Sequence, residues 1–442
     1  MVPKRDLALS NEVPALSPRL SAVMARMGER VDWEKRRRRD AMRVNVDPAR
    51  DLLDRLGSPD GRLRVIHVAG TKGKGSVAMR LAEGLVAAGR SVGVYSSPHV
   101  ERVTERVRIA EKEVEDDALA EGLERALACQ AAAEQDGTQA GQASWFDLMT
   151  AAGLWCMAEA GVEWAVLEVG LGGRLDSTNA ADGELAILTS IDLEHTEILG
   201  STRVAIATEK AGVLRRGRAL VCGVVPDESR GPEENAGARI AKLAQDLDCP
   251  LTLVPPSGSL VETNRSLAGA ALGLLGAAGE LDAAGRPLDA ALLSPGAGWS
   301  LPGRQEHFSV DGTPVLLDGA HVGSSLTAVL DDQNATEGFQ GPIVVVLAMA
   351  ESKPVQSFLK ALDGRVDTVV CTSVPSGIHR SCDDLAAALA PGNFRILAIA
   401  EPQAAIAAAL LRVPVGGWVL VTGSLYLVGA VRASIAANAT PS

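Results

Sequence analysis

The residues best suited to chemistry lie in a glycine-rich turn between an apolar run and a helical stretch. Residues 65–77 read VIHVAGTKGKGSV, a spacing that predicts a strand, a phosphate-binding loop and a helix. The backbone N–H groups of Gly73, Lys74 and Gly75 can point into such a loop, with the N-terminus of the helix behind them. Lys74 adds a mobile positive charge, so the segment is predicted to bind the β- and γ-phosphates of a nucleotide.

This segment departs from the strict P-loop pattern at two positions. Val68 stands where that pattern has its first glycine, and Gly75 follows the lysine in place of serine or threonine. In ordinary P-loops the hydroxyl after the lysine binds Mg²⁺, which glycine cannot do. The metal ligands are therefore expected elsewhere in the chain. A generic glycine-rich turn is the alternative interpretation.

Candidate metal ligands follow three other predicted strands. Glu168 interrupts the apolar strand 164–169, and a buried carboxylate is costly unless it is paired or bound to a metal. Ser97 ends the strand after the loop and can supply the missing hydroxyl, and His195 follows the strand 185–191. Ligands of parallel sheets bind at the carboxyl ends of the strands, so these groups are expected to converge there. A paired structural carboxylate and a structural histidine are the alternatives.

Two further groups of polar residues are candidates of a weaker kind. Lys210 follows Glu209 in a predicted helix, where an exposed pair on the helix surface is the default interpretation. Asp318 and His321 follow a strand in the second half of the chain, and Arg304 precedes that strand. These three side chains can reach a bound nucleotide. Hydrogen bonding within their own turn is the alternative.

The elements that must position these residues alternate along the chain. Nearly apolar strands alternate with helices, which predicts an α/β fold with parallel sheets covered on both faces. The predicted strands lie near residues 65–69, 91–95, 164–169, 185–191, 219–223, 251–254, 315–317, 343–347, 368–371, 395–399 and 418–422. A break near residues 294–304 divides this pattern. We expect an N-terminal P-loop ATPase-like parallel-sheet domain over residues 1–298 and a smaller C-terminal Rossmann-like α/β domain over residues 299–442.

Three polar segments are expected to lie outside these cores. Residues 1–20 are predicted to form a loosely held arm. Residues 111–143 are predicted to form a surface helix followed by a flexible loop. The run Arg36–Arg39 is expected to be a solvated helix face, with the binding of an anionic substrate tail as the alternative.

Composition limits the class of protein. The net charge of the 442 residues is −12, which argues against nucleic acid as the main partner. Aromatic residues make up only 3% of the chain, so its cores must consist of Ala, Val and Leu. The six cysteines show no metal-like spacing, as is typical of reduced thiols in a cytoplasmic protein. We expect no membrane span or signal peptide, since no apolar run reaches about 18 residues, and we expect a monomer.

Several motifs occur in an order that resembles a known family. Together they resemble folylpolyglutamate synthase, including the bifunctional dihydrofolate synthases, within the Mur ligase superfamily. The resemblance covers residues 20–435, and as an ordered set the motifs are highly specific. They are Val68–Ser76, Tyr95–His99 with Glu105–Ile109, Glu168–Asp176 with Thr178 and Asn179, Ser190–Gly200, Glu209–Gly212, Pro302–Arg304 with Glu306, Leu317–His321 and Val421–Tyr426.

The resemblance implies an ATP-dependent amide ligase that uses Mg²⁺. ATP phosphorylates the γ-carboxylate of a folate, and the amine of L-glutamate attacks the resulting acyl phosphate. It further implies roles for individual residues. Mg²⁺ would bind Ser97, Glu168 and His195, and Lys210 would be a carbamylated lysine that supports a second metal, with Lys74, Glu168, His195 and Lys210 as the catalytic set. ATP would contact Thr71, Lys72, Gly73, Lys74, Gly75, Ser76, Asn264, Arg304, Asp318 and His321. The pterin would contact Phe146, Asp147, Leu175, Asp176 and Ser177.

Three residues depart from the family pattern. Lys72 stands where many bacterial members have Asn, Asp147 replaces the commoner Glu, and Val322 replaces the usual Asn after His321. Three other functions stay open at this point. They are a dihydrofolate synthase that uses dihydropteroate, a cell-wall ligase of the Mur type, and a P-loop NTPase or nucleotide-binding regulator without ligase activity.

Overall fold

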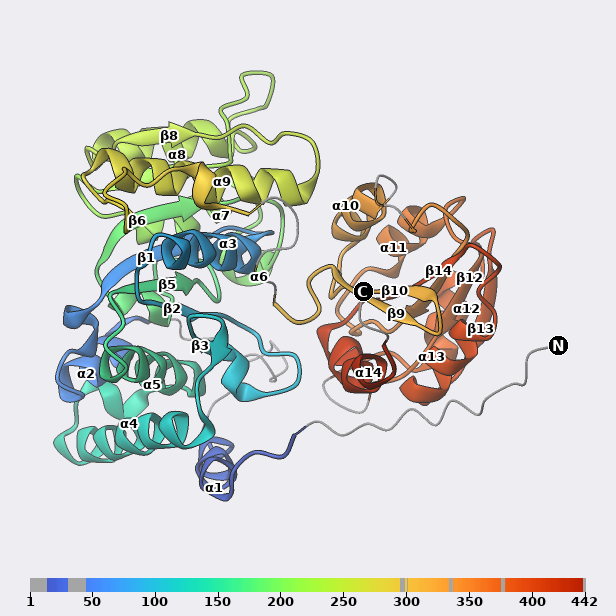
Figure 1. Ribbon diagram of the computed structural model, residues 1–442, viewed down its shortest axis with the longest axis horizontal. Helices are drawn as coiled ribbons and strands as arrows, with labels where there is room; N and C mark the ends of the chain where they lie inside the picture. The colour runs from blue at the N-terminus through green and yellow to red at the C-terminus, as the bar shows by residue number, and fades with distance from the viewer. Residues whose placement is uncertain are drawn as a thin grey trace. The chain divides into compact units, whose positions relative to one another are not determined.

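The computed structural model describes residues 14–30, 45–294, 299, 301–333, 336, 338–374 and 378–439. The chain divides into two compact units, Leu16–Ser300 and Leu301–Ser442 (Figure 1). The Arg36–Arg39 run and most of the predicted N-terminal arm lie outside the described residues. Residues 295–298 also lie outside them, so the predicted domain boundary at residues 298 and 299 stays a prediction.

The N-terminal unit is built on an eight-stranded sheet in the order β4-β3-β2-β5-β1-β6-β7-β8. Its strands are β1 (Arg64–Ala69), β2 (Val92–Tyr95), β3 (Val107–Ile109), β4 (Lys112–Glu113), β5 (Trp164–Glu168), β6 (Gly183–Leu188), β7 (Ala219–Cys222) and β8 (Leu251–Leu253). The six strands from β2 to β8 in this order are parallel, and β3 and β4 are antiparallel additions at one edge. The predicted α/β class with a parallel sheet is confirmed, but β3 and β4 were not predicted because they are only three and two residues long.

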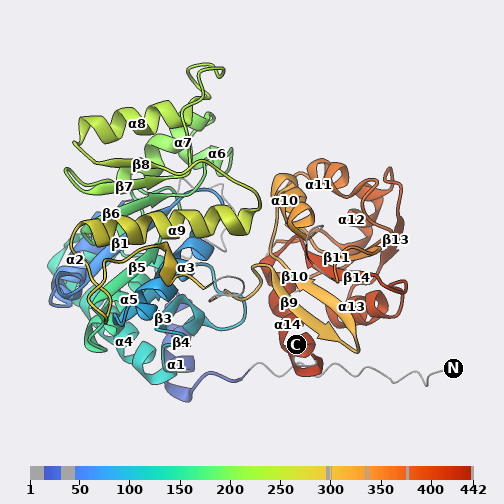
Figure 2. The ribbon, with the colours of Figure 1, turned by 45° about the horizontal axis from the view of Figure 1, so that its top comes forward.

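Helices cover both faces of this sheet, as its apolar strands require. They are α1 (Pro18–Met27), α2 (Asp47–Arg55), α3 (Lys74–Ala87), α4 (Asp116–Asp136), α5 (Trp145–Glu159), α6 (Thr196–Leu199), α7 (Arg203–Lys210), α8 (Ala236–Asp246) and α9 (Leu260–Ala277). Single 3₁₀ turns are η1 (Pro59–Arg62), η2 (Val103–Arg106), η3 (Gln139–Gln142), η4 (Ser177–Ala180), η5 (Ala211–Val213) and η6 (Ala290–Leu292). Helices α3 and α9 pack side by side (Figure 2), and α5 packs on β2 and β3 with α4 and α2 behind it.

Small residues set the distance between α3 and α9. A Cβ atom at Gly84 of α3 would lie 2.5 Å from Leu272 Cδ1 of α9. On α9 itself, a Cβ atom at Gly269 would lie 2.8 Å from Ala290 Cβ of η6, so Gly269 allows η6 to approach α9 closely. Protein interiors are close-packed, so such gaps leave no room for a methyl group. The core of the unit is thus made mainly of Ala, Val and Leu, as the low aromatic content predicted.

The segment 111–143 differs from prediction in its second half. Helix α4 forms as predicted, although residues such as Leu119 and Leu123 on its inner side are fully buried. The following turn is anchored rather than flexible, because Asp51 Oδ2 accepts hydrogen bonds from Thr138 Oγ1 at 2.6 Å and from the Ala140 N–H at 2.7 Å. The prediction of a flexible loop is wrong, since a carboxylate far away in sequence holds the turn.

The C-terminal unit contains a six-stranded sheet in the order β13-β12-β11-β14-β10-β9. Its strands are β9 (Glu306–Val310), β10 (Thr313–Leu317), β11 (Ile343–Leu347), β12 (Thr368–Cys371), β13 (Arg395–Ala398) and β14 (Trp418–Thr422). All pairs are parallel except β9 with β10, and the edge strand β9 was not predicted. Helices α10 (Gly323–Gln333), α11 (Val355–Leu362) and α12 (Cys382–Leu389) share one core with the sheet. Helices α13 (Pro402–Leu410) and α14 (Leu425–Asn438) pack against each other.

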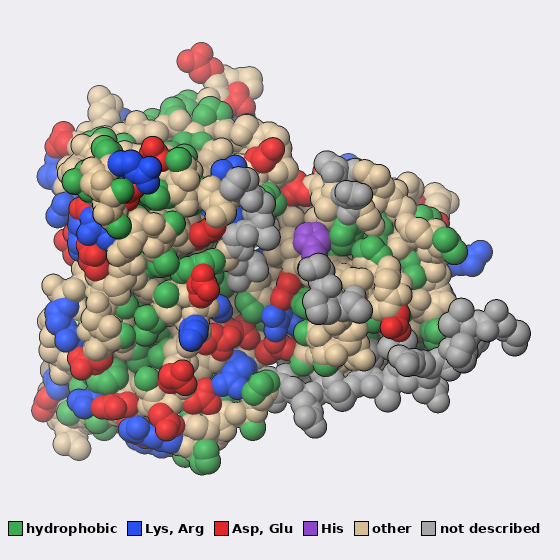
Figure 3. All heavy atoms as spheres, in the orientation of Figure 1, with side chains coloured by type: hydrophobic (Ala, Val, Ile, Leu, Met, Phe, Trp, Pro, Cys, Tyr) green, Lys and Arg blue, Asp and Glu red, His purple; other side chains and the backbone are tan. Residues whose placement is uncertain are grey.

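Acidic and basic side chains are interspersed on the face of the N-terminal unit that Figure 3 shows. The unit carries surface ion pairs such as Arg19 with Glu124 at 2.6 Å and Arg62 with Glu159 at 2.8 Å. Ion pairs as exposed as these contribute little to stability, because water and salt screen them, so the apolar core holds the unit together. No helix in the described part of the chain has both the length and the apolar character that a membrane span needs.

Replacing Asp51 by alanine should lower the free energy of unfolding by about 1–3 kcal/mol, because Thr138, Ala140 and Arg55 all lose a charged acceptor. Urea denaturation measures this change, and limited proteolysis should show new cleavage at residues 137–143. Asp54→Ala is the matched control on the same helix, since the Asp54 side chain is 60% exposed and its carboxylate pairs, among the residues that the structure describes, with Arg50 at the surface. Equal losses in both variants would contradict the anchoring role.

Candidate active site

The predicted phosphate loop follows β1 and is held by the residues that follow β6. Thr189 Oγ1 donates a hydrogen bond to the Lys72 carbonyl at 2.6 Å, and the Lys72 N–H donates to Ser190 Oγ at 2.9 Å. The N–H of Thr71 donates to the Ser190 carbonyl at 2.8 Å. Gly70 must be glycine, because its φ is +146° and a Cβ atom there would lie 1.9 Å from Thr189 Oγ1. These contacts fix the curled backbone of the loop.

Helix α3 begins at Lys74, directly after the loop, and its N-terminus faces the loop. Gly73 takes the N-cap position with a φ of +82° and has no side chain that could cap the helix. The N–H groups of the first turn are therefore available to an anion, with the positive end of the helix dipole behind them. Gly75 and Ser76 belong to this first turn, so the structure gives the segment the strand, loop and helix that its sequence predicts.

Helix α9 brings Asn264 to the same loop. The Asn264 side chain is buried, and a Cβ atom at Gly73 would lie 2.4 Å from its Oδ1 atom. The resemblance alone pointed to Asn264, because an asparagine in an Ala- and Leu-rich stretch carries no motif of its own. Lys72 is also placed at the loop, where its Nζ atom lies 3.5 Å from Asp192 Oδ2.

Lys210 lies in the interior beside the loop, which contradicts the default interpretation of an exposed helix-surface pair. Its side chain is only 2% exposed. Its Nζ atom donates to the Gly70 carbonyl at 2.8 Å and to Glu194 Oε1 at 3.0 Å. The neighbouring Glu209 instead pairs with Arg174. The role that the resemblance implies for Lys210, a carbamylated lysine that supports a second metal, stays a prediction.

The charged groups around Lys210 act on its pKa in opposite directions. Burial, together with the positive charge of Lys74, lowers the pKa of Lys210 to about 8, although Glu194 opposes this shift. Burial alone would raise the pKa of Glu194, but the positive charges of Lys210, Lys74 and His195 together hold it below its ordinary value. The sequence motifs included Glu194 without giving it a role. The structure shows Glu194 as the counter-ion of Lys210, with Lys74 also close enough to act on its charge.

The structure brings two of the three predicted metal ligands together. Glu168 ends β5 and is buried, and the backbone N–H of Ser97 lies 3.3 Å from Glu168 Oε2. His195 follows Glu194 and takes a φ of +48° at the start of α6. The hydroxyl of Ser97 and the carboxylate of Glu168 are oxygen ligands of the kind that Mg²⁺ prefers, whereas an imidazole such as that of His195 is more typical of transition metals. Among the described residues, no three His, Cys, Asp or Glu side chains form a metal-binding group, so the Mg²⁺ assignment stays a prediction.

Three of the five predicted pterin residues, Asp147, Asp176 and Ser177, are buried and hydrogen-bonded. Asp147 Oδ2 caps α5 by accepting from the Ser144 N–H at 2.8 Å, while Asp147 Oδ1 accepts from Ser177 Oγ at 2.5 Å. Burial raises the pKa of Asp147 and of Asp176. The Phe146 ring packs on the loop after β5, where a Cβ atom at Gly170 would lie 2.7 Å from its Cζ atom. Leu175 is partly buried at the start of the same turn. Asp147, which is one methylene shorter than the glutamate common in the family pattern, thus already has hydrogen-bond partners within the protein.

The C-terminal unit gathers its own three candidates around one turn. Asp318 Oδ2 accepts from the Gln305 N–H at 2.9 Å, and Asp318 Oδ1 accepts from the Ala320 N–H at 2.8 Å. Burial raises the pKa of Asp318 against the opposing charge of Arg304. His321 Nδ1 lies 3.2 Å from the Gly319 carbonyl. The alternative of hydrogen bonding within the turn is therefore present, and the predicted contact with ATP stays a prediction.

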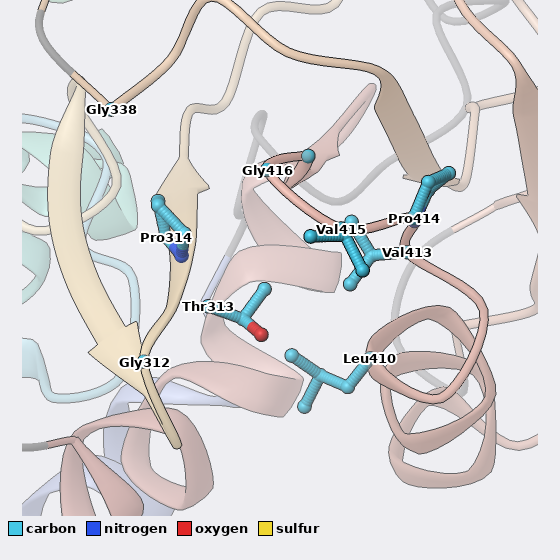
Figure 4. Close-up of a pocket in the computed structure, with 10 residues that line it drawn as sticks. Gly312, Thr313, Pro314, Gly338, Leu410, Val413, Pro414, Val415 and Gly416 are labelled. Atoms are coloured by element: carbon cyan, nitrogen blue, oxygen red, sulfur yellow. The ribbon is translucent and has the colours of Figure 1, made fainter.

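A groove of about 450 Å³ lies elsewhere in the C-terminal unit (Figure 4). It is lined by Gly312, Thr313, Pro314, Gly338, Leu410, Val413, Pro414, Val415, Gly416 and Gly417. None of these residues belongs to the predicted sites, and none is charged. The groove therefore has no part in the candidate chemistry.

Gly73→Ala should weaken nucleotide binding at least tenfold, roughly 1.4 kcal/mol, because the new Cβ atom would collide with Asn264. Gly89→Ala is the matched control at the far end of α3. Its φ of +83° is nearly the same, and its Cβ atom would make only a 3.4 Å contact with Ala283 Cβ. Both variants should lose similar stability, about 1 kcal/mol, from backbone strain. Titration with a fluorescent nucleotide measures the affinity of each variant. Equal affinities in Gly73→Ala and Gly89→Ala would contradict the role of Gly73 beside Asn264.

Comparisons with known proteins agree with this arrangement. Residues 303–425 match the family model of the Mur ligase, glutamate ligase domain. The folylpolyglutamate synthase of Lacticaseibacillus casei is 30% identical over 406 residues, which cover 87% of this chain and 92% of that protein.

Two solved structures share the fold over nearly the whole chain. E. coli FolC in complex with DHPP and ADP has a TM-score of 0.78 and 26% identity, covering 96% of this chain and 99% of that one. The bifunctional folylpolyglutamate synthase/dihydrofolate synthase of Yersinia pestis, complexed with AMPPNP and Mn ion, has a TM-score of 0.75 and 26% identity, covering 96% and 100%. The predicted P-loop, Glu168 and the buried Lys210 lie at the carboxyl edge of the N-terminal sheet. Given this arrangement and a relative that is 30% identical over most of both chains, the chain belongs to the folylpolyglutamate synthase and dihydrofolate synthase family.

Proposed function

We propose that this chain is an ATP-dependent amide ligase that adds L-glutamate to the γ-carboxylate of a reduced folate. A carboxylate oxygen attacks the γ-phosphorus of ATP, and ADP leaves with the electron pair of the broken P–O bond. The amine nitrogen of L-glutamate then attacks the acyl phosphate, loses a proton and expels inorganic phosphate. The observation that carries this proposal is the buried Lys210–Glu194 pair beside the Lys74 loop, at the sheet edge where Glu168 ends its strand.

The protein's part in this reaction is positioning and charge neutralisation. The N–H groups from Gly73 to Ser76 and the Lys74 ammonium are proposed to hold the β- and γ-phosphates, with Thr71, Lys72 and Asn264 lining the loop. Ser97, Glu168 and His195 are proposed to hold Mg²⁺, which when bound would offset the negative charge of the phosphates. In the C-terminal unit, Arg304, Asp318 and His321 are proposed to contact ATP.

The folate end is proposed to lie against the network around Asp147. Phe146 would offer an apolar ring to the pterin, and Leu175, Asp176 and Ser177 would line the adjoining turn. Because Asp147 already accepts hydrogen bonds from Ser144 and Ser177, its contribution would be to orient Ser177.

A second activity, dihydrofolate synthase, has specific support. The Yersinia pestis relative is named as a bifunctional enzyme, and the E. coli structure holds DHPP. Both activities join the amine of L-glutamate to a carboxylate through the same phosphoryl transfer. We therefore carry dihydropteroate as the alternative acceptor. We further propose that the chain acts in the cytoplasm as a monomer.

A paired assay tests this function. Purified protein receives ATP, Mg²⁺ and L-glutamate with either tetrahydrofolate or dihydropteroate, and both phosphate release and product mass are followed. Glutamate addition to tetrahydrofolate alone indicates a dedicated polyglutamate synthase, and addition in both tubes indicates a bifunctional enzyme. Phosphate release with ATP alone, and no addition to either acceptor, would indicate an NTPase and overturn the ligase proposal.

Glu168→Gln should lower the turnover number at least a hundredfold, roughly 2.7 kcal/mol, and shift the Mg²⁺ titration to higher concentration. The amide keeps the shape of the side chain and an oxygen that can accept from Ser97, so the fold should survive. Circular dichroism and thermal unfolding check this point. If the variant turned over with an unchanged Mg²⁺ requirement, Glu168 would be a structural residue.

Lys210 should carry a carbamate when bicarbonate is present. Only a neutral amine attacks CO₂, and with a pKa of about 8 the neutral fraction of Lys210 rises as the pH passes through this value. Activity at limiting bicarbonate should therefore increase from pH 7 to pH 9. Carbon-13 NMR with labelled bicarbonate should give a carbamate signal that is missing from Lys210→Gln. A signal that persists in the variant, or none in the wild type, would contradict the modification.

A further inference from the structure

His67 is a buried polar residue that no motif role accounts for. It lies in β1, three residues before Gly70, and is fully buried. In the register of the sheet it is opposite Leu167 of β5 and Ala186 of β6, so it sits in the middle of the sheet. Central parallel strands are normally almost entirely apolar. A polar side chain in this place is expected to have a specific partner.

That partner is the turn that follows the predicted folate residues. His67 Nε2 lies 2.9 Å from the carbonyl oxygen of Thr178, the second residue of η4. A carbonyl only accepts, so Nε2 must carry the proton. Burial lowers the pKa of His67 to about 4, so the ring is neutral near pH 7 and Nδ1 is unprotonated. Nδ1 is buried and has no hydrogen-bond partner in the described structure.

The space around the other ring nitrogen is limited by a glycine. A Cβ atom at Gly183 of β6 would lie 2.5 Å from His67 Nδ1. Gly183 therefore leaves the space in which the imidazole lies, and its backbone closes off the Nδ1 edge. Leaving a buried nitrogen unpaired costs roughly 1–3 kcal/mol, a cost that an apolar side chain in the same place would avoid. The hydrogen bond to Thr178 is the compensating interaction.

From Thr178 the network continues to both substrate regions. Thr178 Oγ1 donates to Asp176 Oδ1 at 2.5 Å, and Asp176 Oδ2 accepts from the Leu171 N–H at 2.8 Å. Leu171 follows β5, whose last residue is Glu168. Between Asp176 and Thr178, Ser177 binds Asp147. The strand that enters the phosphate loop is thus joined to the turn of residues 175–178 through one hydrogen bond.

We propose that His67 is a positioning residue, whose neutral imidazole holds the 175–178 turn in register with the strand that carries the phosphate loop. The inference depends on the proposed function, because the turn is assigned to the folate acceptor there. His67 does not touch a reacting atom. Its effect is to fix the position of Asp176 and Ser177 along the direction of β1. A folate that binds these residues would then have its carboxylate close to the phosphate loop.

Two substitutions at His67 test this role. His67→Leu removes the donor and leaves the Thr178 carbonyl unpaired, whereas His67→Gln keeps an Nε2–H donor at a similar reach. His67→Leu should raise the KM for the folate acceptor about tenfold, the equivalent of roughly one hydrogen bond. The KM for ATP and the turnover number should change less than about threefold, and His67→Gln should restore most of the loss.

Two other variants separate positioning from packing. Val65→Ala is the matched control, because Val65 lies two residues earlier in β1, on the same face, and is almost fully buried. It should lower the melting temperature without raising the acceptor KM. Gly183→Ala leaves His67 in place but crowds its ring, so it should reproduce the higher acceptor KM. A KM rise in Val65→Ala equal to that in His67→Leu would overturn the proposal.

Nitrogen-15 NMR gives a readout that does not depend on activity. Wild type should show the Nε2–H tautomer of His67 at pH 7, and the amide signals of residues 175–178 should shift in His67→Leu but far less in His67→Gln. An Nδ1–H tautomer, or unmoved turn signals in His67→Leu, would overturn the positioning role. A wild type that shows these signals but adds glutamate to neither acceptor would overturn the proposed function alone.

Discussion

The phosphate loop can receive an anion only if its backbone stays curled around an open space, and the residues after β6 enforce that curl. Thr189 and Ser190 bind the backbone of Thr71 and Lys72 on both its donor and acceptor sides. Because β6 lies directly beside β1 in the sheet, the loop is braced by its nearest neighbour. Ser97 follows β2, Glu168 is the last residue of β5, and Glu194 follows β6. These strands lie on the two sides of β1 in the same sheet, so the position of each residue depends on how its strand pairs in that sheet.

The positive charges of the lysines around the loop are only partly neutralised by acidic side chains of the protein. The positive charge of Lys74 disfavours the charged form of Lys210, and Glu194 compensates only in part. A buried ammonium at Lys210 and the ammonium of the half-buried Lys74 repel each other, which is a poor arrangement for the protein without a ligand. A bound polyanion would give Lys74 an attractive partner, and the proposed carbamate on Lys210 would remove the second positive charge. The site is thus organised around a ligand more negative than any of its own side chains.

The sequence allowed the framework of this site to be predicted, but not all of its contents. The strand before Gly70, the helix after Gly73 and the exceptional carboxylate of Glu168 all follow from local periodicity and from the cost of burying charge. Lys210 was misplaced by the same reasoning, because a helix position does not reveal which neighbouring element will cover it. Asn264 and His67 gave no local signal, since their importance comes from contacts with residues more than a hundred positions away. Strands β3, β4 and β9 escaped prediction because short edge strands carry little apolar pattern.

The close packing of α3 against α9 has a consequence for how this chain can vary. The first turn of α3 carries Lys74, and α9 carries Asn264, so the spacing of the two helices also sets the width of the phosphate loop. That spacing exists because Gly84 leaves room for the Leu272 and Leu293 side chains. A larger residue at position 84 would have to be accompanied by a smaller one at position 272 or 293. Substitutions at positions 84, 272 and 293 should therefore be coupled. Among related sequences, selection for nucleotide binding would then appear as a correlation between the sizes of the residues at these three positions, although they lie at the end of α3 that is far from the loop.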